Sequence, residues 1–366
     1  MDIPSPERLK ELMGGLEDPR VEGRSVHRLE TILVIGLATV LCGGEHFTDM
    51  ERFGTAKQDF FARYVDLSQG VPRHDTFQRI FEALNPEELA GLLVRWTGPT
   101  TGDVVALDGK AVRASKRTGQ STMHLISAYA KERGLVLGQV AVEDKSNEIT
   151  ALPGLIRSLD LADCTVTVDA MGCQKQIARE ITEADALYVL ALKGNQGTTH
   201  QEVVAYLDDA VQRAELPVHE EVDKGHGRLE TRRYVQSDRL DWFADRGKWE
   251  NLQSVAMVEA VRETSEGISR ERRYYLCSLP VDLPRLAHAV RGHWSIENNL
   301  HWVLDVTFGE DRCQVADRIA AQNLGVLRRL ALNLLKQDPL KDALRGKRLR
   351  AGWDNAYLAK LMKFDA

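Results

Sequence analysis

The pattern of residues 103–192 constrains the fold more than any other feature, because it changes from helical to strand-like spacing near Asp103. Short apolar or β-branched runs bounded by polar turns are typical of strands, and longer amphipathic segments are typical of helices. The strands that we expect here are 104–107, 123–131, 135–142, 165–168 and 187–192. The helices that we expect between the later strands are 152–159 and 174–183. Strands that alternate with helices favour a parallel sheet with helices on its faces.

Three strands in a meander, followed by helix, strand, helix and strand, is the order of a ribonuclease H-like α/β core. After a further helix at about 199–214, the pattern returns to strands, with a short helix among them. The expected elements there are strands 228–235, 254–261 and 272–278 and a helix at 240–249. A long helix follows over about 282–305. The sequence therefore predicts an α/β fold, with a ribonuclease H-like catalytic core and a β-strand insertion.

Residues 1–100 have helical spacing and predict an N-terminal all-helical domain. The expected helices are 29–40, 53–64 and 76–84, with Asp75 as the N-cap of the third. A Gly/Pro turn between short helices resembles a helix-turn-helix, which would place Arg73 and Arg79 toward DNA. A plain helical domain that packs on the rest of the chain is the alternative. The remaining units expected are 101–214 and 282–366 for the catalytic core, the latter with a basic tail, and 215–281 for the insertion.

Three carboxylates are the candidate catalytic residues. Asp108 and Asp169 each follow an apolar strand, and Glu297 shares a helix face with Val290 and Leu300. That face is expected to pack on the sheet, where a carboxylate costs several kcal/mol unless it is paired or holds a cation. On helix geometry alone, Glu297 is equally well explained by an ion pair with a neighbour such as Arg291 or by metal binding.

The positions of Asp108 and Asp169 favour metal binding over an ion pair for Glu297. A lone aspartate at a strand end commonly forms a turn, but ligands gather beyond the carboxyl ends of parallel strands. Asp108, Asp169 and Glu297 are therefore expected to converge. Oxygen ligands suit Mg²⁺ or Mn²⁺, and two such ions roughly 3.5–4 Å apart promote in-line displacement at phosphodiesters.

Composition narrows the function classes. No apolar run approaches the roughly 20 residues that span a bilayer, and the five cysteines form no CxxC pair. A reduced cytoplasmic protein is expected, with neither a membrane partner nor a zinc ribbon. A net charge of −6 on its own argues against a nucleic-acid partner. A prediction of nucleic-acid binding must therefore depend on local clusters of basic residues. The alternative for each cluster is an ordinary solvent-exposed face. The sequence has no GxSxG elbow and no P-loop.

Four stretches make the chain similar to a known family. They are Ala106–Lys110, Val166–Gln174, Tyr188–Gln196 and His293–Val306, and Asp311 also fits. The chain resembles the DDE-type transposases of bacterial insertion sequences, most closely the H-repeat-associated family, over nearly its whole length. Related transposases have a tyrosine and an arginine before the glutamate and a lysine one to two turns after it. In this sequence the residue four before Glu297 is His293, and the residue seven after it is Leu304. Arg291 is a candidate replacement for the missing phosphate contact.

The resemblance implies that Asp108, Asp169 and Glu297 are the catalytic triad and bind two divalent metal ions. It implies double-stranded DNA as the partner, both the terminal inverted repeats and the target, and a homodimer on DNA in a bacterial cytoplasm, at the nucleoid when bound. The expected DNA contacts are Arg73, Arg79, Lys110, Lys193, Asn195, Arg228 and Arg291.

The function expected is metal-dependent cleavage of transposon-end DNA and strand transfer of the 3′-hydroxyl into target DNA. A domesticated transposase that binds or regulates DNA without transposition is the alternative, and a nuclease without joining activity is a third reading.

Overall fold

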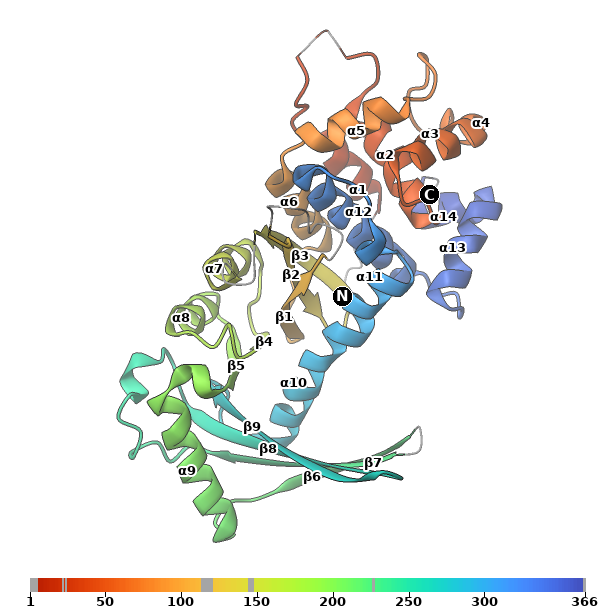
Figure 1. Cartoon of the computed structure of the whole chain (residues 1–366). Helices are drawn as coiled ribbons and strands as arrows, with labels where there is room; N and C mark the ends of the chain where they lie inside the picture. Colours follow the sequence, from red (N-terminus) through yellow and green to blue (C-terminus); the bar gives the residue numbers. More distant parts are fainter. Residues whose placement is uncertain are drawn as a thin grey trace.

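The computed structural model describes residues 6–364 except 22, 24, 113–120, 144–147 and 226–227 (Figure 1). One nine-stranded sheet has the order β3-β2-β1-β4-β5-β9-β8-β7-β6. The first five strands are β1 (Val104–Ala111), β2 (His124–Ala130), β3 (Leu135–Val142), β4 (Thr165–Val168) and β5 (Leu187–Leu192). β1, β2 and β3 are antiparallel neighbours, whereas β4 and β5 run parallel to β1. This order confirms the predicted ribonuclease H-like core.

The predicted β-strand insertion continues the same sheet. Its strands are β6 (His219–Gly225), β7 (Arg228–Ser237), β8 (Ser254–Thr264) and β9 (Gly267–Cys277), and β9 pairs antiparallel with β5. Strand β6 was not predicted, because it is polar and largely exposed and so has no alternating apolar signal. The helix expected at 240–249 is reduced to the 3₁₀ turn η4 (Arg246–Lys248).

Helices cover the two faces of the sheet. Helices α7 (Glu148–Ser158), α8 (Lys175–Glu183) and α9 (Thr198–Gln212) close one face over a buried apolar core. On the other face, α10 (Leu283–Ile296) packs along β1 and β4 through buried residues such as Leu286 and Ala289. The π turn η5 (Glu297–His301) and α11 (Trp302–Val306) then continue α10 toward the N-terminal helices (Figure 1).

The N-terminal and C-terminal helices share one apolar core. The N-terminal helices are α1 (Pro6–Gly14), α2 (Leu29–Leu41), α3 (Phe47–Ala56), α4 (Gln58–Phe61), α5 (His74–Ala83) and α6 (Pro86–Thr97). After the 3₁₀ turn η6 (Glu310–Arg312), the chain ends with α12 (Arg318–Gln337), α13 (Leu344–Trp353) and α14 (Asn355–Met362). The all-helical N-terminal region is therefore confirmed, with α12 packed against α2, α5 and α6.

Several local expectations were wrong. Helix α5 begins at His74 with Arg73 as its N-cap, so Asp75 lies inside its first turn. The helix expected at 53–64 is divided between α3 and α4. The basic C-terminal segment folds as helices rather than as a tail, and it buries Lys347 and Arg348. Among the described residues, no helix is long and apolar enough to cross a membrane.

Candidate metal centre

The three predicted carboxylates line one pocket of about 200 Å³ at the point where α10 crosses the ends of β1 and β4. Asp108 lies inside β1, one residue beyond the last residue that pairs with β4. Asp169 directly follows β4, and Glu297 follows α10 as the first residue of the π turn. Three separate elements thus bring these side chains to one opening.

Asp108 is more buried than Glu297, with 16% of its side chain exposed against 55%. Its Oδ1 accepts a hydrogen bond of 2.9 Å from the backbone N–H of Gly109. Burial raises the pKa of Asp108 to about 7; the charge of His301 opposes this rise, and those of Glu297 and Asp169 add to it. The site therefore concentrates negative charge that a cation would neutralise.

Asp169 forms a turn as well as lining the pocket. Its Oδ1 accepts backbone hydrogen bonds from Met171 (3.0 Å) and Gly172 (3.2 Å). The loop that follows Asp169 is also held by the segment that follows β5. There, the side chain of Asn195 donates to the carbonyl of Ala170 (2.8 Å), and that of Gln196 donates to the carbonyl of Cys173 (2.6 Å). Asp169 is thus the turn-forming residue that a strand-end aspartate usually is, held rigidly at the pocket.

The expectation that Glu297 lies on a buried face was wrong. Its side chain is 55% exposed, although Val290 and Leu300 on the same predicted stripe are buried. Helix α10 carries Glu297 past the sheet to the open pocket, and the π turn shifts the following residues relative to α-helical spacing. Arg291 pairs instead with Glu221 (3.6 Å) and Asp223 (3.4 Å) of β6.

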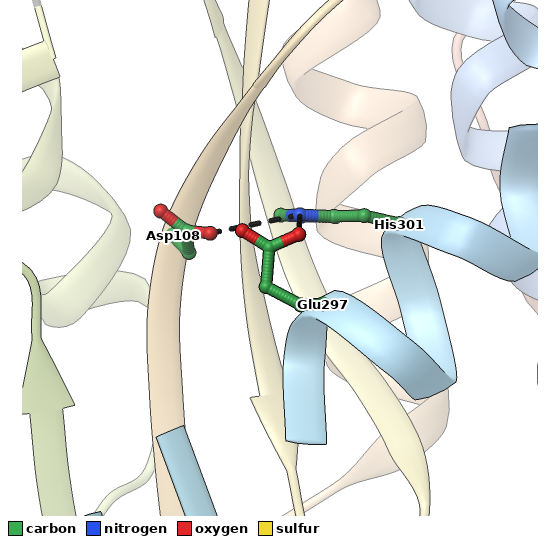
Figure 2. A group of neighbouring side chains, drawn as sticks. All are labelled: Asp108, Glu297 and His301. Carbon is green, nitrogen blue, oxygen red and sulfur yellow. Dashed lines mark ion pairs between the residues drawn. The ribbon is translucent and has the colours of Figure 1, made fainter. Parts of the chain in front are cut away.

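His301 lies beside Asp108 and Glu297, and it was not predicted as a site residue. Its Nδ1 lies 3.6 Å from Asp108 Oδ2 and 3.5 Å from Glu297 Oε2, as the dashed lines in Figure 2 show. The pKa of Glu297 is lowered, chiefly by its interaction with His301. The sequence contained a signal, since His293 and His301 flank Glu297 by four residues on either side, but spacing alone does not separate them.

The residues present fit a divalent cation. One ligand atom each from Asp108, Glu297 and His301 lies within 4.8 Å of the other two, which is the spacing of ligands around a single ion. Carboxylate oxygen and imidazole nitrogen are both donors that Mn²⁺ and related ions accept. Asp169 lines the same pocket outside this close group.

The rim of the pocket is cationic and aromatic. Lys193, which follows β5, and Arg273 of β9 both line it, together with the half-exposed Trp294 of α10. The Arg273 guanidinium lies 4.4 Å from the centre of a Trp294 ring. The insertion therefore contributes two residues of β9, Arg273 and Tyr275, to the same opening as the carboxylates.

The other residues predicted to contact DNA lie in different environments. Lys110 is buried, and its Nζ lies near Asp305 (2.6 Å), Asp311 (2.9 Å) and Glu310 (3.4 Å), so it faces no open surface. Arg79 is exposed on α5, and Arg73 is exposed at the N-cap of that helix. Arg228 is exposed at the start of β7, at the end of the insertion hairpin. Of the predicted set, only Lys193 lines the carboxylate pocket, and Asn195 supports its loop.

Comparison with known proteins matches the chain to transposases. Residues 99–334 match the family model described as "Transposase DDE domain", and residues 10–97 match the one described as "DDE_Tnp_1-associated". The chain is 34% identical to "Putative transposase YncI" of Escherichia coli O157:H7, over 95% of this chain and 92% of that protein. It is also 34% identical to "H repeat-associated putative transposase YhhI" of E. coli K12, over 97% of each chain.

Among solved structures, the piggyBac transposase synaptic complex with hairpin DNA aligns with a TM-score of 0.44 and 10% identity, over 99% of this chain and 82% of that chain. The family models together cover most of the chain, and the relatives match it nearly end to end. The chain therefore belongs to the DDE transposase family, with the H-repeat-associated transposases among its relatives.

Proposed function

We propose that this chain cleaves the ends of its own transposable element and joins the freed 3′-hydroxyl to target DNA. The observation that carries the proposal is the single pocket lined by Asp108, Asp169 and Glu297, which come from two adjacent strands and the helix that crosses them. Membership of the transposase family supports DNA as the substrate class, and the proposed substrate within it is double-stranded DNA with terminal inverted repeats.

The catalytic residues would act mainly by holding charge and position. Asp108 and Glu297, with Asp169 across the pocket, would hold divalent cations, Mg²⁺ or Mn²⁺, two in the full catalytic state. When bound, such ions activate a water or hydroxyl nucleophile and stabilise the leaving oxygen. The backbone hydrogen bonds on Asp169 Oδ1 fix that side chain and leave its second oxygen for this role.

The cationic groups around the pocket would hold the DNA backbone. Lys193 lies on its rim and can neutralise a phosphate next to the scissile bond. Arg273, also on the rim, is paired with Glu271 (2.9 Å) and would exchange that partner for a phosphate. Arg73 at the N-cap of α5, Arg79 on that helix and Arg228 on the insertion hairpin would contact duplex farther away. A homodimer on DNA would pair the two ends of the element.

The test is cleavage of a labelled duplex that carries one terminal repeat and its flanking DNA, in Mg²⁺ or Mn²⁺. The wild-type chain should nick the repeat end, and a pre-cleaved end with a free 3′-hydroxyl should be joined to a target plasmid. Asp169→Asn and Glu297→Gln should each lower the cleavage rate by about a thousandfold or more, as loss of a major charge-stabilising group does. Glu183→Gln, at an exposed position at the end of α8, is the matched control and should cut normally.

The outcomes separate the three functions. Cleavage and joining by the wild type, abolished in the site variants, support the transposase. Cleavage without joining would indicate a nuclease. Tight repeat-specific binding without cleavage would indicate a regulatory protein, and a short relative of 37% identity over 20% of this chain is named "Inactive transposase YbfQ".

A further inference from the structure

The two histidines that flank Glu297 have different surroundings. His293 lines the same pocket as the three carboxylates, but its Nδ1 lies 3.1 Å from Thr167 Oγ1. His301 Nδ1 instead faces Asp108 Oδ2 at 3.6 Å and Glu297 Oε2 at 3.5 Å. The geometry thus distinguishes two histidines that the sequence places symmetrically.

His301 is also a buried group without a full set of partners. Its side chain is only 7% exposed, and its Nε2 has no hydrogen-bond partner among the described residues. Both distances from Nδ1 to the carboxylate oxygens are longer than those of ordinary N–H···O hydrogen bonds, which are about 2.7–3.2 Å. Within the described part of the chain, Nδ1 therefore has no close hydrogen-bond partner at a buried position, which is costly unless another group, such as a cation, binds this nitrogen.

A shared cation accounts for these separations. With metal–ligand bonds of about 2.1 Å, neighbouring ligand atoms around one ion lie about 3 Å apart and opposite ones about 4.2 Å apart. The ligand atoms of Asp108, Glu297 and His301 all lie within 4.8 Å of one another, so small rotamer adjustments would bring them around one ion. The π turn contributes directly, because it contains both Glu297 and His301.

We propose that His301 Nδ1 is a metal ligand beside Asp108 and Glu297, and that this nitrogen makes the site prefer a first-row transition ion such as Mn²⁺ over Mg²⁺. Mg²⁺ takes oxygen ligands and dehydrates reluctantly, whereas imidazole suits transition metals. The inference rests on the proposed function, because it specifies the cation of the same site.

The test is Mn²⁺ binding to the full-length chain without DNA, followed by electron paramagnetic resonance. In the wild type, pulsed spectra should show ¹⁴N coupling to the bound Mn²⁺. His301→Gln should remove the coupling and weaken Mn²⁺ binding by about tenfold or more. His293→Gln is the matched control, one turn before Glu297 instead of one turn after, and should keep the coupling.

A competition titration tests the metal preference. Mg²⁺ should displace Mn²⁺ from the wild type only at a concentration about tenfold or more above that of Mn²⁺. His301→Asp offers an all-oxygen set, so it should bind Mn²⁺ without ¹⁴N coupling and should narrow the difference between the two ions. Circular dichroism checks that each variant is folded.

Wild-type protein that binds Mn²⁺ without ¹⁴N coupling would overturn the proposal, and so would coupling that is lost in His293→Gln but kept in His301→Gln. If His301→Gln does not fold, the wild-type and His293→Gln spectra still decide. DNA cleavage without ¹⁴N coupling would leave the proposed function standing and remove this inference. Coupling without any DNA cleavage would leave the His301 inference standing and would remove the proposed function.

Discussion

Lys110 and its partners show how single buried charges can position the candidate site. Lys110 lies on β1, two residues after Asp108, and its carboxylate partners Asp305 and Asp311 follow the π turn that carries His301. Glu310 adds a buried pair of 2.9 Å with Arg329 of α12. These charges therefore join the strand that carries Asp108 to the segment that carries His301.

We predict that Glu310→Gln lowers the free energy of unfolding by about 3–5 kcal/mol, since removal of one partner leaves buried cations uncompensated. Although burial would raise it, the charges of Arg329 and Lys110 lower the pKa of Glu310 to about 2. Its stabilising contribution is then complete above pH 4.5 and is lost as the pH falls toward 2. Urea denaturation at several pH values measures this. A difference between variant and wild type that does not shrink in acid would contradict it.

Asp108 should have the opposite dependence on pH. Its pKa is raised to about 7, so ionisation in the metal-free fold costs stability as the pH rises from about 4, and the cost is complete above 7. In EDTA, the unfolding free energy of Asp108→Asn minus that of the wild type should increase as the pH rises through that window, by up to about 1.4 kcal/mol per pH unit. Denaturation curves from pH 5 to 8 measure the gain. Mn²⁺ at pH 8 should reverse it, and Glu183→Gln should show no such trend.

The site residues could be predicted from the sequence to different extents. Asp169 was proposed because the end of its strand is marked by a short apolar run, and β4 does end at Val168. The same reasoning led to Asp108, although the predicted strand end at 107 was wrong, because β1 continues to Ala111 and Asp108 lies inside it. Glu297 was identified by a burial argument that was wrong, since α10 carries it beyond the sheet to an open pocket. His301 was missed because its role depends on three-dimensional proximity to Asp108, which lies in a distant part of the sequence.

At the scale of elements, the predicted strands were close to the observed ones wherever burial gave a pattern. Residues 135–142, 165–168 and 187–192 match β3, β4 and β5. The exposed β6 has no such pattern, because solvent accepts any polar residue on both of its faces. The π turn also lacked a signal, since it depends on how α10 and α11 pack rather than on a local residue preference.

The loop after β4 gives a prediction at this scale. Asn195→Ala removes the hydrogen bond to the Ala170 carbonyl, so the unfolding free energy should fall by about 1 kcal/mol. Hydrogen exchange in a peptide that covers residues 169–174 should become faster, because this bond holds the loop that carries Asp169. Gln253→Ala, which removes an exposed amide elsewhere on the chain, is the control. Unchanged exchange at 169–174 would mean that the turn bonds alone hold Asp169.

At the scale of the whole molecule, the expected boundary near residue 100 does not separate independent packing units. Helix α12 lies 200 residues or more from the N-terminal helices in sequence but shares their core. Asn323 Nδ2 donates to the carbonyls of Phe81 and Leu84, each at 2.9 Å. Asn333 both accepts from the N–H of Val136 and donates to its carbonyl. One helix thus bonds to the N-terminal helices and to the edge strand β3.

We therefore predict that the N-terminal helices and the catalytic core unfold together. Asn333→Ala should lower the unfolding free energy by about 1–3 kcal/mol, because it leaves a buried N–H and carbonyl of Val136 without partners. Tryptophan fluorescence and far-ultraviolet circular dichroism should shift to lower urea by the same amount, since a single transition has coincident probes. A chain that ends at residue 317 should lose protection from hydrogen exchange in α2, far from the deletion in sequence. If α2 stayed protected in that shortened chain, the N-terminal helices would be an independent domain, because their core would then be complete without α12.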